Sequence, residues 1–160
     1  MTRKEIESGA YIFIIAGSET TASLLAGALY LLLTNPDHLK KLTQEIRSSF
    51  KREDDIDIQS TANLTFLNAV LQESLRLYPP VPNTFPRATP QPGEMICGKF
   101  VPGGTTVGIH HWASYRSGRN FHLPDDFIPE RWLGDDRFKD DRRDVCQPFS
   151  YGPRNCIGQK

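Results

Sequence analysis

The sequence predicts a mainly α fold with small β-sheets, an α+β class, from two observations. Helical patterns fill the chain up to the pair Pro79-Pro80, where they stop. Beyond that pair, prolines and glycines divide the chain into pieces that suit short strands, turns and ordered coil. The 160 residues are enough for one domain with a real core, and no internal repeat or low-complexity tract is visible.

The first helical pattern is apolar on nearly all sides. Tyr11 to Leu33 carries one ionisable side chain, Glu19, and reaches the roughly 20 residues that span a bilayer. Such a helix can equally be the central helix of a globular core. A carboxylate in mid-bilayer would cost about 3 kcal/mol. We therefore favour the core helix and keep a membrane anchor as an alternative.

Two further helices follow. Asn35 is expected to cap the second, with Pro36 at its first position, and its apolar positions recur at helical spacing, at Leu39, Leu42, Ile46 and Phe50. The charged stretch Lys51–Ile58 lacks this period and predicts a loop. Thr65 is expected to cap a third helix that ends at Tyr78, with an apolar face at Leu67, Val70, Leu71 and Leu75.

The second half predicts short elements. Three short strands are expected, at Thr84–Ala88, Met95–Cys97 and Thr105–Ile109. The stretch Phe100–Val107 resembles a hairpin closed by a Pro102-Gly103 turn. A short helix is expected at Trp112–Ser117, followed by ordered coil from Gly118 to Pro148. Coil of that length in a compact domain usually wraps something functional.

Charge and cysteine usage narrow the function classes. Nineteen basic and nineteen acidic side chains cancel, so charge gives no reason to expect nucleic acid as a partner. The odd count and wide spacing of Cys97, Cys146 and Cys156 do not suggest a secreted disulfide framework, and we interpret the first two as free thiols. The four histidines lack the spacing of metal ligands, and we interpret them as ordinary polar residues.

The most specific motif is the ten-residue stretch Phe149–Gly158, which contains Cys156. Glycines on both sides of a cysteine allow close approach of the backbone to a large flat ligand. The stretch matches Phe-x-x-Gly-x-Arg-x-Cys-x-Gly and resembles the haem-thiolate loop of the cytochrome P450 family. The resemblance implies that Cys156 is the axial ligand to the iron of haem b. It also implies that Arg154 meets a haem propionate and that the cofactor loop includes Phe149, Gly152 and Gly158.

Glu73 and Arg76 stand at positions i and i+3 of the third predicted helix, where they can pair. On its own, such a pair is more often an exposed contact of small energetic effect. The family resemblance implies instead a buried network with Arg131, from the segment Pro129–Trp132. Removing one member would then leave a buried unpaired charge, at about 3–5 kcal/mol.

The stretch Ala16–Thr21 resembles the family's segment above the haem. The resemblance implies that Thr20 and Glu19 relay protons to bound oxygen, whereas the plain alternative is a polar patch at a helix contact. The stretch around Phe85-Pro86 resembles that of fungal biosynthetic members. There Arg87 matches a position that often contacts a propionate.

The resemblance implies a haem-dependent monooxygenase that inserts one oxygen atom of O2 into a small apolar substrate. Electrons would come from an NADPH-dependent reductase, and the full-length parent would lie on the cytosolic face of the endoplasmic reticulum membrane. Other haem-thiolate reactions, such as isomerisation or dehydration of peroxides, use the same loop, but Glu19 beside Thr20 favours oxygen activation.

Family members are more than twice as long as this chain. The resemblance implies the C-terminal part of the fold, without its N-terminal half, membrane anchor and final helix. We therefore expect weak haem binding or none, and exposed apolar faces on the long helix, with a tendency to aggregate. Two alternatives remain open: a catalytically inactive truncated fragment, and a small membrane protein anchored by Tyr11–Leu33.

Overall fold

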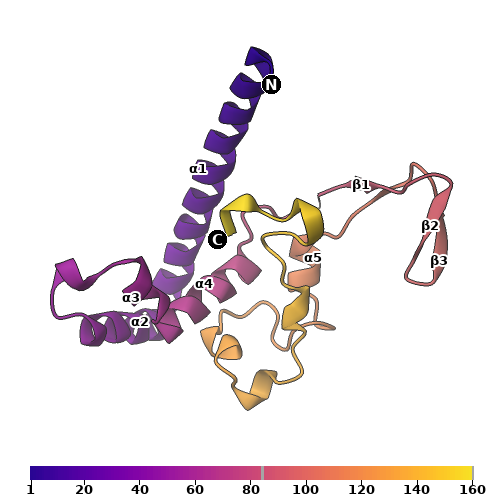
Figure 1. Cartoon of the computed structure of the whole chain (residues 1–160). Helices are drawn as coiled ribbons and strands as arrows, with labels where there is room; N and C mark the ends of the chain where they lie inside the picture. Colours follow the sequence, from indigo (N-terminus) through magenta and orange to yellow (C-terminus); the bar gives the residue numbers. More distant parts are fainter. Residues whose placement is uncertain (84, 160) are drawn as a thin grey trace.

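The computed structural model describes residues 1–83 and 85–159. Helices dominate the first half, and short strands, 3₁₀ turns and coil make up the second (Figure 1). This distribution confirms the predicted α+β class. The helices are α1 (Arg3–Thr34), α2 (Pro36–Ser49), α3 (Ile58–Ala62), α4 (Thr65–Leu77) and α5 (His111–Tyr115). The strands are β1 (Arg87–Ala88), β2 (Gly93–Ile96), β3 (Lys99–Pro102) and β4 (Thr106–Val107).

Helix α1 projects from the rest of the chain by its N-terminal part (Figure 1). Its burial is confined to the C-terminal end, where Gly27, Ala28 and Leu32 pack. A Cβ atom on Gly27 would lie 2.3 Å from Cδ1 of Tyr78, so only glycine allows this approach. The core-helix prediction therefore holds for the C-terminal end of α1 alone.

The exposed part of α1 is consistent with the membrane-anchor alternative. Within residues 1–83 and 85–159, α1 is the helix whose length and composition would allow it to cross a membrane. Its start is fixed by a capping box, in which Thr2 Oγ1 accepts the Glu5 N–H at 3.3 Å and Glu5 Oε2 accepts the Thr2 N–H at 2.6 Å.

The hydrophobic core lies where the end of α1 meets α2, α4 and the later coil. Its buried members are Leu32, Leu42, Phe66, Val70, Leu77 and Phe127. The apolar face predicted for α2 supplies Leu42, with Leu39 and Ile46 packed at its edge. The amphipathic pattern of the second helix thus correctly located its buried side.

Of the two helix caps expected from sequence, Asn35 stands at the N-cap position of α2 with Pro36 at the first helical position, but without a side-chain cap hydrogen bond, and the cap expected at Thr65 is wrong. Leu64, not Thr65, precedes α4, and the first backbone N–H groups of that helix bind Glu45 of α2 instead. Its carboxylate accepts from Phe66 N at 2.8 Å and Leu67 N at 2.9 Å. Asn35 does not cap α2 with its side chain, because Nδ2 donates to the Leu31 carbonyl at 2.8 Å and closes α1.

The connection between α2 and α4 is more ordered than the predicted loop. It holds a 3₁₀ turn at Glu53–Asp55 and the short helix α3. Asp57 caps α3 by accepting the Ser60 N–H at 2.7 Å, and this hydrogen bond lowers the pKa of the Asp57 carboxyl.

The strands form two antiparallel pairs, β1 with β4 and β2 with β3. The hairpin predicted around Pro102-Gly103 is wrong, since β3 pairs with the preceding strand, β2. The turn between β2 and β3 is Cys97-Gly98, where both residues have positive φ (51° and 76°), as two-residue hairpin turns require. Of the strand predicted at 84–88, Arg87 and Ala88 form β1, and Thr84 lies outside the described residues.

The coil from Gly118 to Pro148 lies beside α4 (Figure 1) and contacts it through the 3₁₀ turn Pro129–Trp132. Three 3₁₀ turns interrupt it, at Pro129–Trp132, Asp136–Phe138 and Arg143–Val145. Helix α5 begins at His111, one residue before the predicted start, and ends at Tyr115. This coil carries the chain from α5 to the cysteine loop, so its packing on α4 determines where that loop lies.

Candidate functional site

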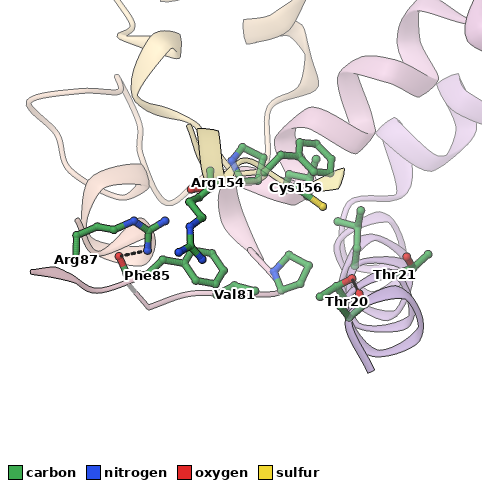
Figure 2. A pocket seen from close by; sticks show the side chains of 14 residues that line it. Thr20, Thr21, Val81, Phe85, Arg87, Arg154 and Cys156 are labelled. Carbon is green, nitrogen blue, oxygen red and sulfur yellow. Dashed lines mark hydrogen bonds between the residues drawn. The ribbon is translucent and has the colours of Figure 1, made fainter. Parts of the chain in front are cut away.

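A cavity of about 540 Å³ lies between α1, the segment after α4 and the cysteine loop (Figure 2). Most of its surface is apolar. It is lined by Ala16, Thr20, Thr21, Leu24, Leu75, Pro80, Val81, Phe85, Arg87, Pro148, Phe149, Ser150, Arg154 and Cys156. This size lies within the range of pockets that bind small molecules and cofactors.

The cysteine loop is held by its own backbone. Cys156 N donates to the Phe149 carbonyl at 2.8 Å, and Asn155 N donates to the Gly152 carbonyl at 3.0 Å. Gly152 has φ +82°, a conformation that favours glycine. A Cβ atom on Gly158 would lie 3.7 Å from the Cys156 sulfur, so Gly158 passes close beside the thiol. Phe149 and Cys156 both line the cavity, and Cys156 is exposed.

Arg87 and Arg154 enter the cavity on the side of Phe85, whereas Cys156 lies nearer Thr20 (Figure 2). The guanidinium group of Arg87 donates to the carbonyls of Phe85 and Pro86, at 3.4 and 3.0 Å. The cavity thus combines apolar walls with two cations at one end and a thiol towards the other. Such a cavity suits a flat apolar ligand with carboxylates at one edge.

Of the two residues proposed for proton transfer, the structure brings one to the cavity. Thr20 lines it, and its Oγ1 donates to the Ala16 carbonyl at 2.6 Å. Glu19 is exposed and lies outside the described residues that line the cavity. Thr21, which sequence reasoning did not single out, also lines it. The Thr20-Thr21 pair was the available signal.

Glu73, Arg76 and Arg131 come together in the interior, each fully buried. Arg76 donates to Glu73 through two nitrogens, Nε at 2.9 Å and Nη2 at 2.8 Å. Arg131 Nε donates to Glu73 Oε1 at 3.1 Å. The exposed-pair interpretation of Glu73 and Arg76 is excluded by this burial.

Two members of the network were missed by sequence reasoning. Asp141 accepts a short hydrogen bond from Arg131 Nη1, and its other oxygen accepts the His122 N–H at 2.7 Å. Trp132 Nε1 donates to Glu73 Oε2 at 2.8 Å. With Asp141 the buried network holds two carboxylates and two guanidinium groups, so its formal charge is zero. Asp141 lies in predicted coil, where no periodic pattern points to a partner. Its place in an acidic stretch was the available signal.

Arg76 ties the network to the coil around it. Its Nη1 donates to the carbonyls of Tyr115 and Pro124, at 2.8 and 2.5 Å, and Nη2 donates to that of Asp126 at 3.0 Å. Backbone carbonyls far apart in sequence thus converge on one side chain. Because buried carbonyls need donors, the arginine fixes the path of the coil.

The cysteines are free thiols, as expected for Cys97 and Cys146. Burial raises the pKa of Cys146 to about 12, although the charge of Arg76 opposes the shift. Burial also raises the pKa of Tyr115. Cys146 therefore stays protonated at neutral pH and is a poor metal ligand.

Comparison with known proteins gives the same family that the cysteine loop resembles. The family model described as "Cytochrome P450" matches residues 1–160. The chain is 55% identical to "Cytochrome P450 monooxygenase aclL" of Aspergillus oryzae, across 99% of this chain and 32% of that protein. It is also 55% identical to "Averantin hydroxylase" of Aspergillus parasiticus, across 100% of this chain and 32% of that protein.

The chain spans about a third of the length of the curated relatives it matches. These relatives are fungal proteins named as oxygenases or hydroxylases, in agreement with the resemblance that the stretch around Phe85-Pro86 and the cysteine loop indicated. Since the family model matches the chain from its first residue to its last, the chain belongs to the cytochrome P450 family.

Proposed function

We propose that this chain supplies the haem-facing part of a monooxygenase that acts on a small apolar substrate, in which the Cys156 sulfur would hold the iron of haem b. One observation carries the proposal. The Cys156 thiol, two guanidinium groups and the Thr20 hydroxyl line a single apolar cavity.

The residues around this cavity fit a haem. The apolar walls, formed by Leu24, Leu75, Val81 and other side chains, suit the faces of a porphyrin. Arg87 and Arg154 can pair with its propionates, which need charge-assisted donors when partly buried.

When bound, the haem supplies the activation of O2 and the transfer of one oxygen atom to the substrate. The chain's own side chains hold, orient and supply protons. Cys156 Sγ would hold the iron as thiolate, and Arg87 and Arg154 would orient the macrocycle through its carboxylates. Thr20 Oγ1 holds a proton at the cavity surface. Glu19, exposed to solvent one residue earlier, replenishes that proton.

For the whole protein we propose O2 and an NADPH-dependent reductase as partners, and the cytosolic face of the endoplasmic reticulum membrane as its location. The family and the printed names of the relatives support a monooxygenase. The exposed apolar part of α1 is compatible with a chain that functions beside further protein or lipid.

Reconstitution with haem tests the axial ligand. The full chain, mixed with haem, reduced and treated with carbon monoxide, is expected to give the red-shifted Soret band of a thiolate-ligated haem. Cys156→Ser should abolish the band, and Cys97→Ser, at an exposed cysteine in the hairpin turn, should leave it unchanged. A band that survives Cys156→Ser would contradict the assignment. A wild-type chain that binds no haem would favour an inactive fragment.

The membrane alternative has one observation in its favour, the exposed apolar surface of α1. Under that alternative the chain would be a small non-enzymatic protein anchored by Tyr11–Leu33. Carbonate extraction of the expressed chain separates the two. A chain that remains with the lipid after extraction supports the anchor, and one released into the soluble or aggregated fraction contradicts it.

A further inference from the structure

Helix α5 carries two buried rings that the proposed mechanism does not use, His111 and Tyr115. They stand one turn apart and stack, with ring centroids 5.3 Å apart and planes 11° from parallel. Tyr115 is fully buried and His111 nearly so. Both lie outside the described residues that line the cavity, yet each contacts a segment that does.

The His111 ring contacts the cavity wall formed by the segment after α4, from Val81 to Phe85. Its Nδ1 lies 3.1 Å from the Val81 carbonyl. Because a carbonyl oxygen only accepts, Nδ1 carries the proton in this contact. The same ring forms a T-shaped pair with Phe85, with centroids 6.4 Å apart and planes at 69°. The next backbone N–H, of Trp112, donates to the Pro82 carbonyl at 3.0 Å.

The Tyr115 side chain binds the other cavity wall, the segment that leads from Gln147 to the Cys156 loop. Its hydroxyl oxygen accepts the Gln147 N–H at 2.9 Å. Gln147 directly precedes Pro148 and Phe149, which line the cavity, and the Phe149 carbonyl accepts the N–H of Cys156. Two hydrogen bonds therefore separate the tyrosine ring from the backbone of the cysteine.

We propose that His111 and Tyr115 are positioning residues that set the spacing between the Val81–Phe85 wall and the Cys156 loop, and so the width of the slot that receives the haem. The stacked rings make a rigid strut, because each ring is held at its outer edge by a backbone hydrogen bond and at its inner face by the other ring. The statement about the haem slot rests on the proposed function. The spacing role of His111 and Tyr115 is independent of it.

Amide hydrogen exchange of the full chain without haem tests the strut. His111→Phe keeps the ring and removes the donor to Val81, and Tyr115→Phe keeps the ring and removes the acceptor for Gln147. Each variant should speed exchange by about five- to tenfold at its own wall and also at the far wall. The far-wall amides are Gln147 and Cys156 for the first variant and Trp112 for the second.

His110→Phe, at the exposed neighbouring histidine, is the matched control and should change neither wall. A His111→Phe effect confined to Trp112, with Gln147 and Cys156 unchanged, overturns the strut. If Tyr115→Phe unfolds the chain, as circular dichroism would show, His111→Asn decides instead. It retains a donor near Val81 but loses the stack, and it should still speed exchange at Gln147.

The cofactor arm measures haem release from the reconstituted chain into excess apomyoglobin. Tyr115→Phe and His111→Phe should each release haem about tenfold faster, and His110→Phe at the wild-type rate. Equal rates in all four proteins would overturn the link to the slot. A wild-type chain without bound haem defeats the proposed function, while the exchange result still decides the strut.

Discussion

The interior around α4 and the cavity face beside α1 differ in how far their side chains find partners within the chain. Around α4, Glu73, Arg76 and Arg131 are fully buried, and their charges are matched by partners from within the chain. On the cavity face, Cys156 is exposed and α1 presents large apolar side chains to its surroundings. The charges of the scaffold are therefore matched within the described residues, whereas the cavity face leaves a thiol and large apolar side chains exposed to a ligand or a further surface.

Removing the central carboxylate should break the scaffold most severely. Glu73→Gln leaves Arg76 and Arg131 buried with Asp141 as the one remaining described carboxylate of their network, at an expected cost of about 3–5 kcal/mol. Urea denaturation followed by circular dichroism measures the loss. The matched control is Glu7→Gln, which removes an exposed helical pair with Arg3 and should change stability by less than about 0.5 kcal/mol. Equal effects would refute the buried network.

Asp141 should matter less than Glu73 but more than its neighbour. Asp141→Asn keeps a neutral acceptor for Arg131 and removes one charge from the balanced set. We expect a loss of about 1.5–3 kcal/mol, the usual range for hydrogen bonds to charged groups. Asp140→Asn, at the adjacent exposed carboxylate, is the control in the same urea experiment. If both variants are neutral, Asp141 does not belong to the network.

The network and the cysteine loop were predictable from sequence to different degrees. Helix spacing paired Glu73 with Arg76, because residues three apart on a helix share a face, and the family resemblance added Arg131 to the hypothesis. Asp141 escaped, since a residue in coil has no periodicity to reveal its partner. The Cys156 loop was recognisable by its glycines, but His111 and Tyr115 were not, because their role depends on two backbone segments that only the fold brings to them.

Helix existence was easier to predict than helix boundaries. Apolar spacing located the buried side of α2, whereas the cap of α4 was assigned to Thr65 and comes from Glu45. The acceptor stands on another helix, about 20 positions earlier in the chain. The hairpin was misplaced for a related reason. Pro102-Gly103 is a strong local turn signal, but strand pairing selected Cys97-Gly98.

Alkaline pH should weaken the scaffold through Cys146. Its pKa rises from about 9 in the unfolded chain to about 12 on folding, so the folded state retains a proton that the unfolded state loses. The stabilisation is therefore fully present below pH 9 and is lost as pH rises towards 12. Between pH 8 and pH 10 we expect a loss of about 1 kcal/mol.

The same titration in Cys146→Ala is the control for this pH effect. Its stability should fall less over the same interval, with a remainder from Tyr115, whose pKa is also raised by burial. Urea midpoints at several pH values measure both proteins. Identical pH profiles would show that Cys146 titrates normally and is not buried in solution.

The smallest effect is expected on the exposed part of α1. Phe13 is 65% exposed, so Phe13→Ser removes little buried area and should change the free energy of unfolding by less than about 0.5 kcal/mol. Leu32→Ala, on the buried end of the same helix, should cost about 2–5 kcal/mol. Because exposed apolar patches promote association, Phe13→Ser should also lower light scattering at high protein concentration. A loss of more than 2 kcal/mol at Phe13 would show that the N-terminal part of α1 packs against the rest of the chain, and the contrast between the two regions would fail.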